Sequence, residues 1–486
     1  MNPLFIVVAC AVLASLVALH WYVWRRLVRD TTRPGSLVRR VATVLVVLGP
    51  VLFVGAFATG RSGLPFVVKQ IVAWPGYLWG AVFLYLLLAL LAGELVRPLL
   101  LRMRAPGERG REAGGAEPAE PAEPAEPAEP AESAEPAEPA ESAESAESAE
   151  SAEPSAPADT TGTPTATPTG TATGGCAVAE PATATAPSAP APPAPPAGTL
   201  PPGDPDPKPR PTPSRRLFVS RIVGGTAAAV ALGTVGAGTY GVLRGPRLKH
   251  VTVPLAKLPR AAHGYRIAVV SDVHLGPILG RGHTQRIVDT INSAQPDLVA
   301  VVGDLVDGSV AELGHAAEPL AQLRARDGSY FVTGNHEYFS GAAEWVDHVR
   351  ELGLRPLENA RVEKAGFDLA GVNDVAGESY GQGPDFVRAL GDRDRGRASV
   401  LLAHQPIVID EAVEHGVDLQ LSGHTHGGQL WPGNLIAGLA NPTVEGLERY
   451  GDTQLYVSRG AGAWGPPVRV GAPSDITIVQ LAAKRS

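Results

Sequence analysis

The sequence Asp-Leu-Val-Ala-Val-Val-Gly-Asp-Leu-Val-Asp, residues 297–307, decides the fold class of this chain. Residues 297–302, which are apolar and mostly β-branched after Asp297, predict a β-strand. This strand runs into Gly303-Asp304-Leu305-Val306-Asp307, and the glycine allows a tight turn at the strand end. We therefore expect the Asp304 carboxylate to lie at the edge of a sheet.

Two neighbouring segments have the same arrangement. Residues 265–270 predict a strand that leads into Asp272-Val273-His274, and residues 329–333 predict one that leads into Gly334-Asn335-His336-Glu337. Helices are expected between the strands, over 283–294 and 316–326. Right-handed crossovers make such strands parallel and place their carboxyl ends on one edge. Asp272, Asp304 and Asn335 should therefore converge.

The second half of the globular part repeats this pattern. An apolar run over 398–403 leads into His404, and one over 417–421 leads into Gly423-His424-Thr425-His426. Further strands are expected over 454–459 and 475–481. A second sheet facing the first gives the predicted fold class: α/β, a two-sheet sandwich with α/β/β/α layers and the polar residues along its rim.

These polar residues form a mixed nitrogen and oxygen ligand set without thiolate, which suits divalent metals. A two-metal centre clamps both the attacking and the leaving oxygen of a phosphoryl transfer. Asp304 is central enough to bridge two ions, and His424 and His426, one residue apart, can face different ions. Asn335 offers a neutral oxygen, which keeps the charge of the site low enough for a phosphate to approach.

From about Lys249 to the C-terminus, these motifs in this order resemble the calcineurin-like metallophosphoesterase family. Gly334-Asn335-His336-Glu337-Tyr338 and His424-Thr425-His426-Gly427-Gly428-Gln429 are similar to its membrane-associated bacterial branch, in which some members act on phosphodiesters or lipid-linked pyrophosphates. The resemblance implies a fold of the metallophosphoesterase type and an enzyme that hydrolyses phosphodiester, phosphomonoester or pyrophosphate bonds.

The resemblance also implies residue roles. One metal ion would be held by Asp272, His274, Asp304 and His426, and the other by Asp304, Asn335, His404 and His424. His336 would contact the phosphate and assist the leaving group, Asp307 would orient His336, and a hydroxide bridging the metals would be the nucleophile. Two divalent ions are expected as cofactors, and manganese, iron and zinc all suit the ligands.

Three apolar stretches near the N-terminus predict transmembrane helices: Pro3–Trp24, Val41–Thr59 and Val72–Leu95. Arginines fill the loop between the first two stretches and follow the third. By the positive-inside rule, these arginines are cytoplasmic. We therefore expect a multi-pass protein of the cell membrane, with a membrane region over 1–103.

The next segment, 104–213, is an Ala-, Glu- and Pro-rich stretch that predicts a disordered linker. Residues 214–247 predict a fourth transmembrane helix or a twin-arginine-like anchor, because Ser214-Arg215-Arg216-Leu217-Phe218 precedes an apolar run. Positive-inside flanking charge explains the same arginines. Both interpretations place the catalytic domain, 248–486, outside the cytoplasm if the apolar run from Leu217 inserts into the membrane. If this run does not insert, the alternative is a cytoplasmic domain.

Charge and cysteine content narrow the function classes further. The Glu-rich repeat supplies much of the acidic count behind the net charge of -8, and no basic stripe indicates nucleic-acid binding. The two cysteines, Cys10 and Cys176, lie outside the globular part, so a thiolate site is excluded there. The expected partners are the membrane and a phosphoester substrate, lipid-linked or part of the cell envelope.

The alternative function is a non-catalytic, metal-binding membrane sensor with the same fold. Five histidines without motif context are expected to be solvated or to cap helices: His263, His283, His315, His348 and His415.

Overall fold

The computed structural model describes residues 3–60, 62–102 and 214–484. The stretch 104–213, predicted to be a linker, lies outside the described residues.

Within the described residues, the first sheet has six strands in the order β1-β12-β2-β3-β4-β5. Its strands are β1 (Arg247–Leu255), β2 (Arg266–Val270), β3 (Leu298–Val302), β4 (Ser329–Val332), β5 (Arg355–Pro356) and β12 (Asp475–Ala483). β2, β3 and β4 pair in parallel, as predicted. Val270 lies opposite Val301, and Val302 lies opposite Val332, so the three carboxyl ends meet at one edge.

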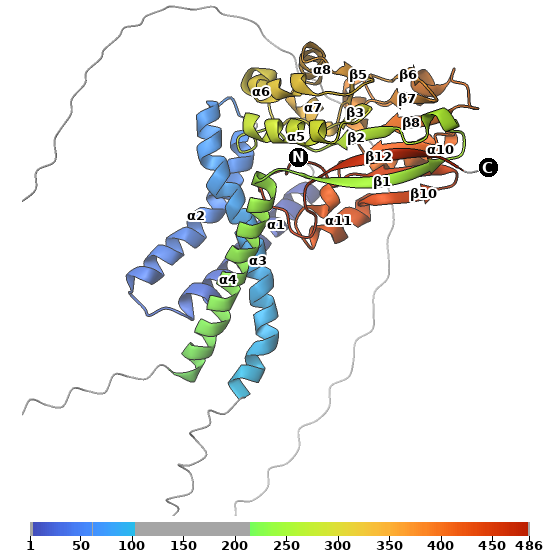
Figure 1. Cartoon of the computed structure of the whole chain (residues 1–486). Coiled ribbons are helices and arrows are strands. Elements are labelled where there is room, and N and C mark those ends of the chain that lie inside the picture. The colour runs from blue at the N-terminus through green and yellow to red at the C-terminus, as the bar shows by residue number, and fades with distance from the viewer. Residues whose placement is uncertain (1–2, 61, 103–213, 485–486) are drawn as a thin grey trace, which may run out of the picture. The chain divides into compact units, whose positions relative to one another are not determined.

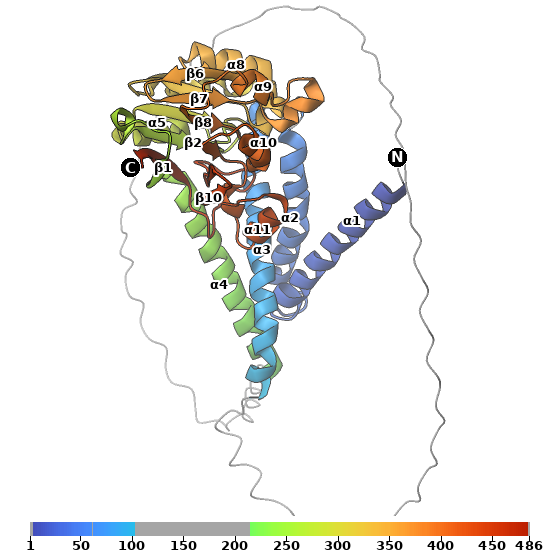
Figure 2. The ribbon, with the colours of Figure 1, turned by 90° about the vertical axis from the view of Figure 1, so that its right-hand side faces the viewer.

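The second sheet also has six strands among the described residues, in the order β10-β11-β9-β8-β7-β6. Its strands are β6 (Ala360–Lys364), β7 (Phe367–Gly371), β8 (Ala398–Leu402), β9 (Leu419–Ser422), β10 (Gly446–Tyr450) and β11 (Thr453–Val457). The four central strands pair in parallel and the two edge strands are antiparallel. Figure 2 shows β6, β7 and β8 side by side.

The two sheets face each other across one apolar core. Ile267 and Val269 of β2 pack in the same buried cluster as Val400 and Leu402 of β8. Helices α5 (Arg281–Ser293), α6 (Val310–Ala317) and α8 (Ala342–Glu351) cover the outer face of the first sheet (Figure 1). Helices α9 (Phe386–Leu390) and α10 (Ile409–Glu414) cover the outer face of the second sheet. This arrangement confirms the predicted α/β/β/α sandwich.

Two helices of the domain occupy strand connections near the sheet edge. They are α7 (Asn335–Ser340) and α11 (Gly433–Ala440).

The prediction of one α-helix over 316–326 is wrong: α6 ends at Ala317, and a 3₁₀ helix follows over Glu318–Gln322. Pro319 explains the break, because proline has no backbone N–H to continue the α-helical ladder.

The N-terminal part and the segment before the domain form long apolar helices. They are α1 (Pro3–Val23), α2 (Leu37–Gly60), α3 (Phe66–Arg102) and α4 (Arg215–Leu243). Among the described residues, α2, α3 and α4 have the length and composition needed to cross a membrane. α1 coincides with the first predicted span and leads into a short π-helix over Trp24–Arg29.

The long helices pack closely on one another and on the domain. A Cβ atom added at Gly76 of α3 would lie 2.3 Å from the carbonyl oxygen of Leu52 in α2. On the domain side, the Tyr85 hydroxyl of α3 donates to the carbonyl oxygen of Trp431 at 3.0 Å. Lys69 of α3 forms an ion pair with Glu312 of α6 at 2.6 Å. The apolar helices therefore share an interface with the sandwich.

Candidate metal centre

The candidate ligands stand in tight turns directly after strand ends. Five of them have positive φ angles: Asp272 (53°), His274 (49°), Asp304 (53°), His424 (71°) and His426 (53°). Left-handed backbone is unfavourable for residues that carry a Cβ atom, by about 1–2 kcal/mol each. The turns hold these residues in conformations that they would not adopt on their own.

Glycines let the turns approach one another. Gly303 has φ +73°, and a Cβ atom there would lie 2.7 Å from the His404 ring. A Cβ atom at Gly423 would lie 1.8 Å from the Ser271 hydroxyl. The second position shows how closely the β9 turn of one sheet approaches the β2 turn of the other.

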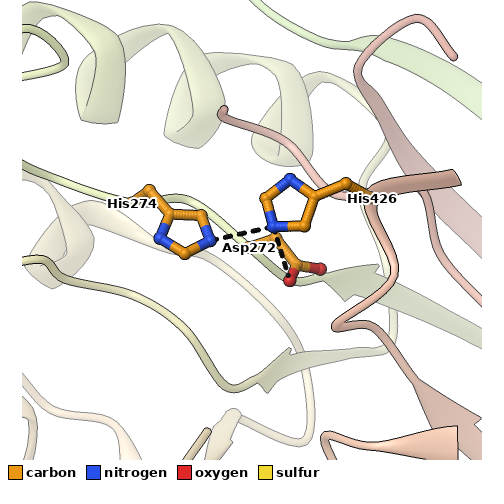
Figure 3. A group of neighbouring side chains, drawn as sticks. All are labelled: Asp272, His274 and His426. Atoms are coloured by element: carbon orange, nitrogen blue, oxygen red, sulfur yellow. Dashed lines mark hydrogen bonds and ion pairs between the residues drawn. The ribbon is translucent and has the colours of Figure 1, made fainter. Parts of the chain in front are cut away.

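One group of side chains consists of Asp272, His274 and His426 (Figure 3). Nε2 of His274 lies 3.0 Å from Nε2 of His426, which lies 3.4 Å from Oδ1 of Asp272. All three residues are buried. Burial, and then the neighbouring His274, hold the pKa of His426 well below its usual range, so this imidazole is neutral and can offer a lone pair to a metal.

A second group consists of Asp304, His404 and His424. Nε2 of His404 lies 3.2 Å from Oδ2 of Asp304. The carboxamide oxygen of Asn335 lies 3.0 Å from Nδ1 of His424. Burial, and then His404, lower the pKa of His424 to about 4, which also favours a neutral imidazole.

Asp304 lies between the two groups. Its Oδ2 atom is 3.2 Å from His404 in one group and 3.7 Å from Nε2 of His274 in the other. Burial opposes ionisation of Asp304, but the imidazoles of His404 and His274 outweigh it and hold the pKa of Asp304 well below its usual range. A pair of divalent cations requires nitrogen and oxygen donors around each ion and a carboxylate shared between them. The two groups of side chains and the ionised, buried Asp304 together form such a set.

The fit to a metal is also supported by the orientation of the His404 ring. Its buried Nε2 atom faces Oδ2 of Asp304 at 3.2 Å. Its other ring nitrogen, Nδ1, lies 2.9 Å from the carbonyl oxygen of Val302, which fixes the ring with Nε2 toward Asp304. A second ring nitrogen anchored in this way is typical of metal-ligating histidines.

Asp307 joins the site to His336. Oδ1 of Asp307 lies 2.7 Å from Nδ1 of His336 and 2.9 Å from Nδ1 of His274. Burial opposes ionisation of Asp307, but the two imidazoles lower its pKa to about 2. Burial likewise opposes protonation of His336, but Asp307 raises its pKa to about 9. His336 therefore carries a proton at neutral pH. Contact between Asp307 and His274 was not expected from the sequence.

The structure thus brings together all nine predicted site residues, in the two sets expected around Asp304. Their roles as ligands and as catalytic groups stay predictions.

Glu337 is a further site residue, to which the sequence assigned no role. Its side chain is buried and accepts hydrogen bonds from the backbone N–H groups of Asp304 (3.0 Å), Leu305 (2.7 Å) and Gly334 (2.6 Å). It therefore ties the turn after β3 to the turn after β4. Glu337 follows His336 directly, so its place in the motif was the available signal.

Arg469 also supports the site. The sequence did not reveal this role, because Arg469 belongs to none of the motifs that carry the other site residues. Its buried guanidinium donates to the carbonyl oxygens of His426 (3.0 Å), Gly462 (2.7 Å) and Ala472 (3.1 Å).

The prediction that His283 is solvated or caps a helix is wrong. Its side chain is buried, because it lies on the face of α5 that packs against the domain.

Comparisons with known proteins identify the family of this chain. Residues 265–428 match the family model of the calcineurin-like phosphoesterases. A "transmembrane protein with metallophosphoesterase domain" from Danio rerio is 39% identical over 250 residues, which are 49% of this chain and 57% of that protein. The chain therefore spans little more than half the length of that relative.

A metallophosphoesterase from Helicobacter pylori strain J99 is 36% identical over 275 residues, covering 56% of this chain and 74% of its own. Among solved structures, a dimetal phosphatase from Danio rerio shares 13% sequence identity with a TM-score of 0.30, and the likeness covers 44% of this chain and 91% of that one. The family model and the Helicobacter relative establish that this chain belongs to the calcineurin-like metallophosphoesterase family.

Proposed function

We propose that this protein is a membrane-anchored phosphoesterase that uses two divalent metal ions to hydrolyse phosphodiester, phosphomonoester or pyrophosphate bonds. The observation that carries the proposal is the position of Asp304 between two clusters of buried imidazoles and oxygen atoms, with the paired His336 and Asp307 beside them. Family membership gives the class of reaction.

The proposed ligands are Asp272, His274, Asp304 and His426 for one ion, and Asp304, Asn335, His404 and His424 for the other. When bound, two divalent ions supply the Lewis acidity that activates a water as the nucleophile and offsets the charge of a phosphate. Manganese, iron and zinc all suit these nitrogen and oxygen donors.

His336 and Asp307 are the proposed catalytic pair. Asp307 fixes Nδ1 of His336 at 2.7 Å, so Nε2 is the ring nitrogen left to face a substrate. A protonated imidazole donates a hydrogen bond to a phosphate oxygen, and it can deliver its proton to the oxygen that leaves. The same pair argues against the sensor alternative, because a protein that only binds metal has no use for a poised acid.

We propose the domain organisation expected from the sequence, with the catalytic part at 248–486 outside the cytoplasm. The ends of the apolar helices support this orientation. Arg26 pairs with Glu94 at 2.9 Å, and Arg221 donates to the carbonyl oxygen of Thr31 at 3.0 Å. These arginines gather where α3 ends and α4 begins, whereas the sandwich follows the other end of α4. The positive-inside rule assigns the arginine end to the cytoplasm.

The test uses the full-length chain in detergent with manganese and bis-p-nitrophenyl phosphate as substrate. We expect His336→Ala to lower kcat by about 10²–10⁴-fold, the usual range for loss of a general acid. Asp304→Asn should lower activity at least as far and weaken manganese binding. The matched control is His250→Ala, which removes an exposed histidine of β1. Activity that survives both site substitutions would refute the proposal.

A further inference from the structure

A cavity of about 790 Å³ lies next to the candidate metal centre. His274, Asp307 and His336 line one side of it. Phe57 at the end of α2 and Tyr77 of α3 line another side, although both belong to the apolar helices. Its volume lies within the range of about 300–1,000 Å³ that is usual for small-molecule sites. The cavity is therefore built jointly by the sandwich and by helices that could cross a membrane.

Aromatic rings connect the two sides without interruption. The Phe57 ring lies 5.2 Å from that of Phe53 and 5.8 Å from that of Trp464. The Trp464 ring in turn lies 5.7 Å from the His336 ring. These separations are those of contacting aromatic pairs. An apolar wall therefore runs from the middle of α2 to the proposed catalytic histidine.

The wall starts on a helix that has an exposed apolar surface. Val51 and Val54 precede Phe57 on α2, and each is 63% exposed. A helix with such an exposed apolar surface is stable in a bilayer rather than in water. A molecule that lies in the bilayer could follow the aromatic wall from α2 into the cavity.

The charge of the cavity selects among phosphate compounds. Lys69 is the one Lys or Arg among its described lining residues. Its ammonium is almost fully buried and is paired with Glu312 at 2.6 Å. Lys69 is therefore neutralised within the protein. A nucleotide polyphosphate or an anionic polymer would bring further negative groups that the described lining does not offset, whereas a molecule with one phosphoester group would not.

We propose that the α2–α3 hairpin forms part of the substrate site, and that the substrate is a membrane lipid with a single phosphoester group. Its phosphate lies at the metal centre beside His336, and its apolar chain lies against Trp464 and Phe57. The inference rests on the proposed function and narrows it. Under this assignment Phe57 and Trp464 are specificity-determining residues, and α2 has a role beyond anchoring.

The experiment compares acylated and deacylated substrates on the full-length chain in mixed detergent micelles with manganese. Phosphatidic acid is paired with glycerol 3-phosphate, and phosphatidylglycerol with glycerophosphoglycerol. We expect kcat/KM to be at least about tenfold higher for one acylated compound than for its deacylated partner, the preference that one well-packed apolar contact supplies. bis-p-Nitrophenyl phosphate serves as the reference substrate.

Substitutions then test the wall itself. Phe57→Ala should lower the ratio of lipid turnover to reference turnover by at least about fivefold, and Phe57→Leu, which keeps an apolar contact, should restore most of it. The matched control is Leu45→Ala, an exposed residue of the same helix outside the cavity lining, which should leave the ratio unchanged. Melting temperatures show whether each variant is folded.

The outcomes separate the two proposals. If the reference substrate is cleaved but neither acylated compound is preferred, the lipid inference is overturned and the proposed function stands. If the preference exists but Phe57→Ala leaves the ratio unchanged in a folded protein, the role of the hairpin is overturned. If no substrate is cleaved with manganese, iron or zinc, the proposed function fails, and the inference fails with it.

Discussion

Replacing Glu337 by glutamine should loosen the metal centre without touching a ligand. The two carboxylate oxygens accept three buried backbone N–H groups: Oε2 from Asp304 and Gly334, and Oε1 from Leu305. A glutamine amide has one oxygen. Its best placement keeps the two bonds at Oε2 and turns the amide NH₂ group toward the N–H of Leu305.

The magnitude follows from that one lost acceptor. A buried donor without a partner costs about 1–3 kcal/mol. For a domain of this size, each 1 kcal/mol lowers the melting temperature by about 2–4 °C, so we expect a decrease of about 2–12 °C for Glu337→Gln. Because Asp304 loses part of its support, manganese affinity should fall by about 10–100-fold, as is usual when the residues behind metal ligands are changed.

The assay is thermal unfolding of the metal-free full-length protein in detergent, followed by a manganese titration. Glu414→Gln, an exposed residue of α10, is the matched control. If Glu337→Gln melts within about 1 °C of the wild type and binds manganese equally well, the assignment of Glu337 as a clamp between the two turns is wrong.

Two other predictions concern the core and the helices. Burial, and then Arg286, lower the pKa of His283 to about 4 from its ordinary 6.5. Between pH 6.5 and 4, His283 therefore binds a proton in the unfolded chain but not in the folded chain. The free energy of unfolding should fall with falling pH across that window, by up to about 3 kcal/mol. Melting curves at pH 7 and pH 5 should differ less for His283→Gln than for the wild type; equal differences would contradict this role. Gly76→Ala should lower the melting temperature in detergent, because its Cβ atom would meet the backbone of α2, whereas Gly241→Ala, with open space around it, should not. Equal effects of the two substitutions would show that α2 and α3 do not pack as described.

The sequence predicted those features that depend on local patterns. The apolar run before Asp304 and its counterparts before Asp272 and His404 predicted the strands, and parallel pairing made their ends converge. Features that depend on distant contacts were missed. The parallel pairing of β1 with β12 joins residues that are more than two hundred positions apart. Arg469 reaches its acceptors only through a loop conformation that no local pattern encodes.

The cavity was missed for the same reason. The aromatic residues of α2 are of the kinds found in any membrane-spanning helix, so the sequence of α2 predicted only a membrane anchor. Only the fold places Phe57 beside Trp464. Likewise, the short run around His283 shows helical spacing, but the sequence did not reveal that this imidazole faces the core.

The left-handed turns at the metal centre have a consequence for engineering. Glycine at position 272 or 304 would relieve backbone strain, and so would asparagine to a lesser degree, because both tolerate positive φ. A selection for heat resistance carried out in the presence of a chelator would therefore favour variants that have lost the metal centre. The same selection with manganese supplied would keep the ligands, because an ion that binds only the folded chain adds its binding free energy to stability. Thermostabilised forms of this protein should accordingly be sought only with the metal present.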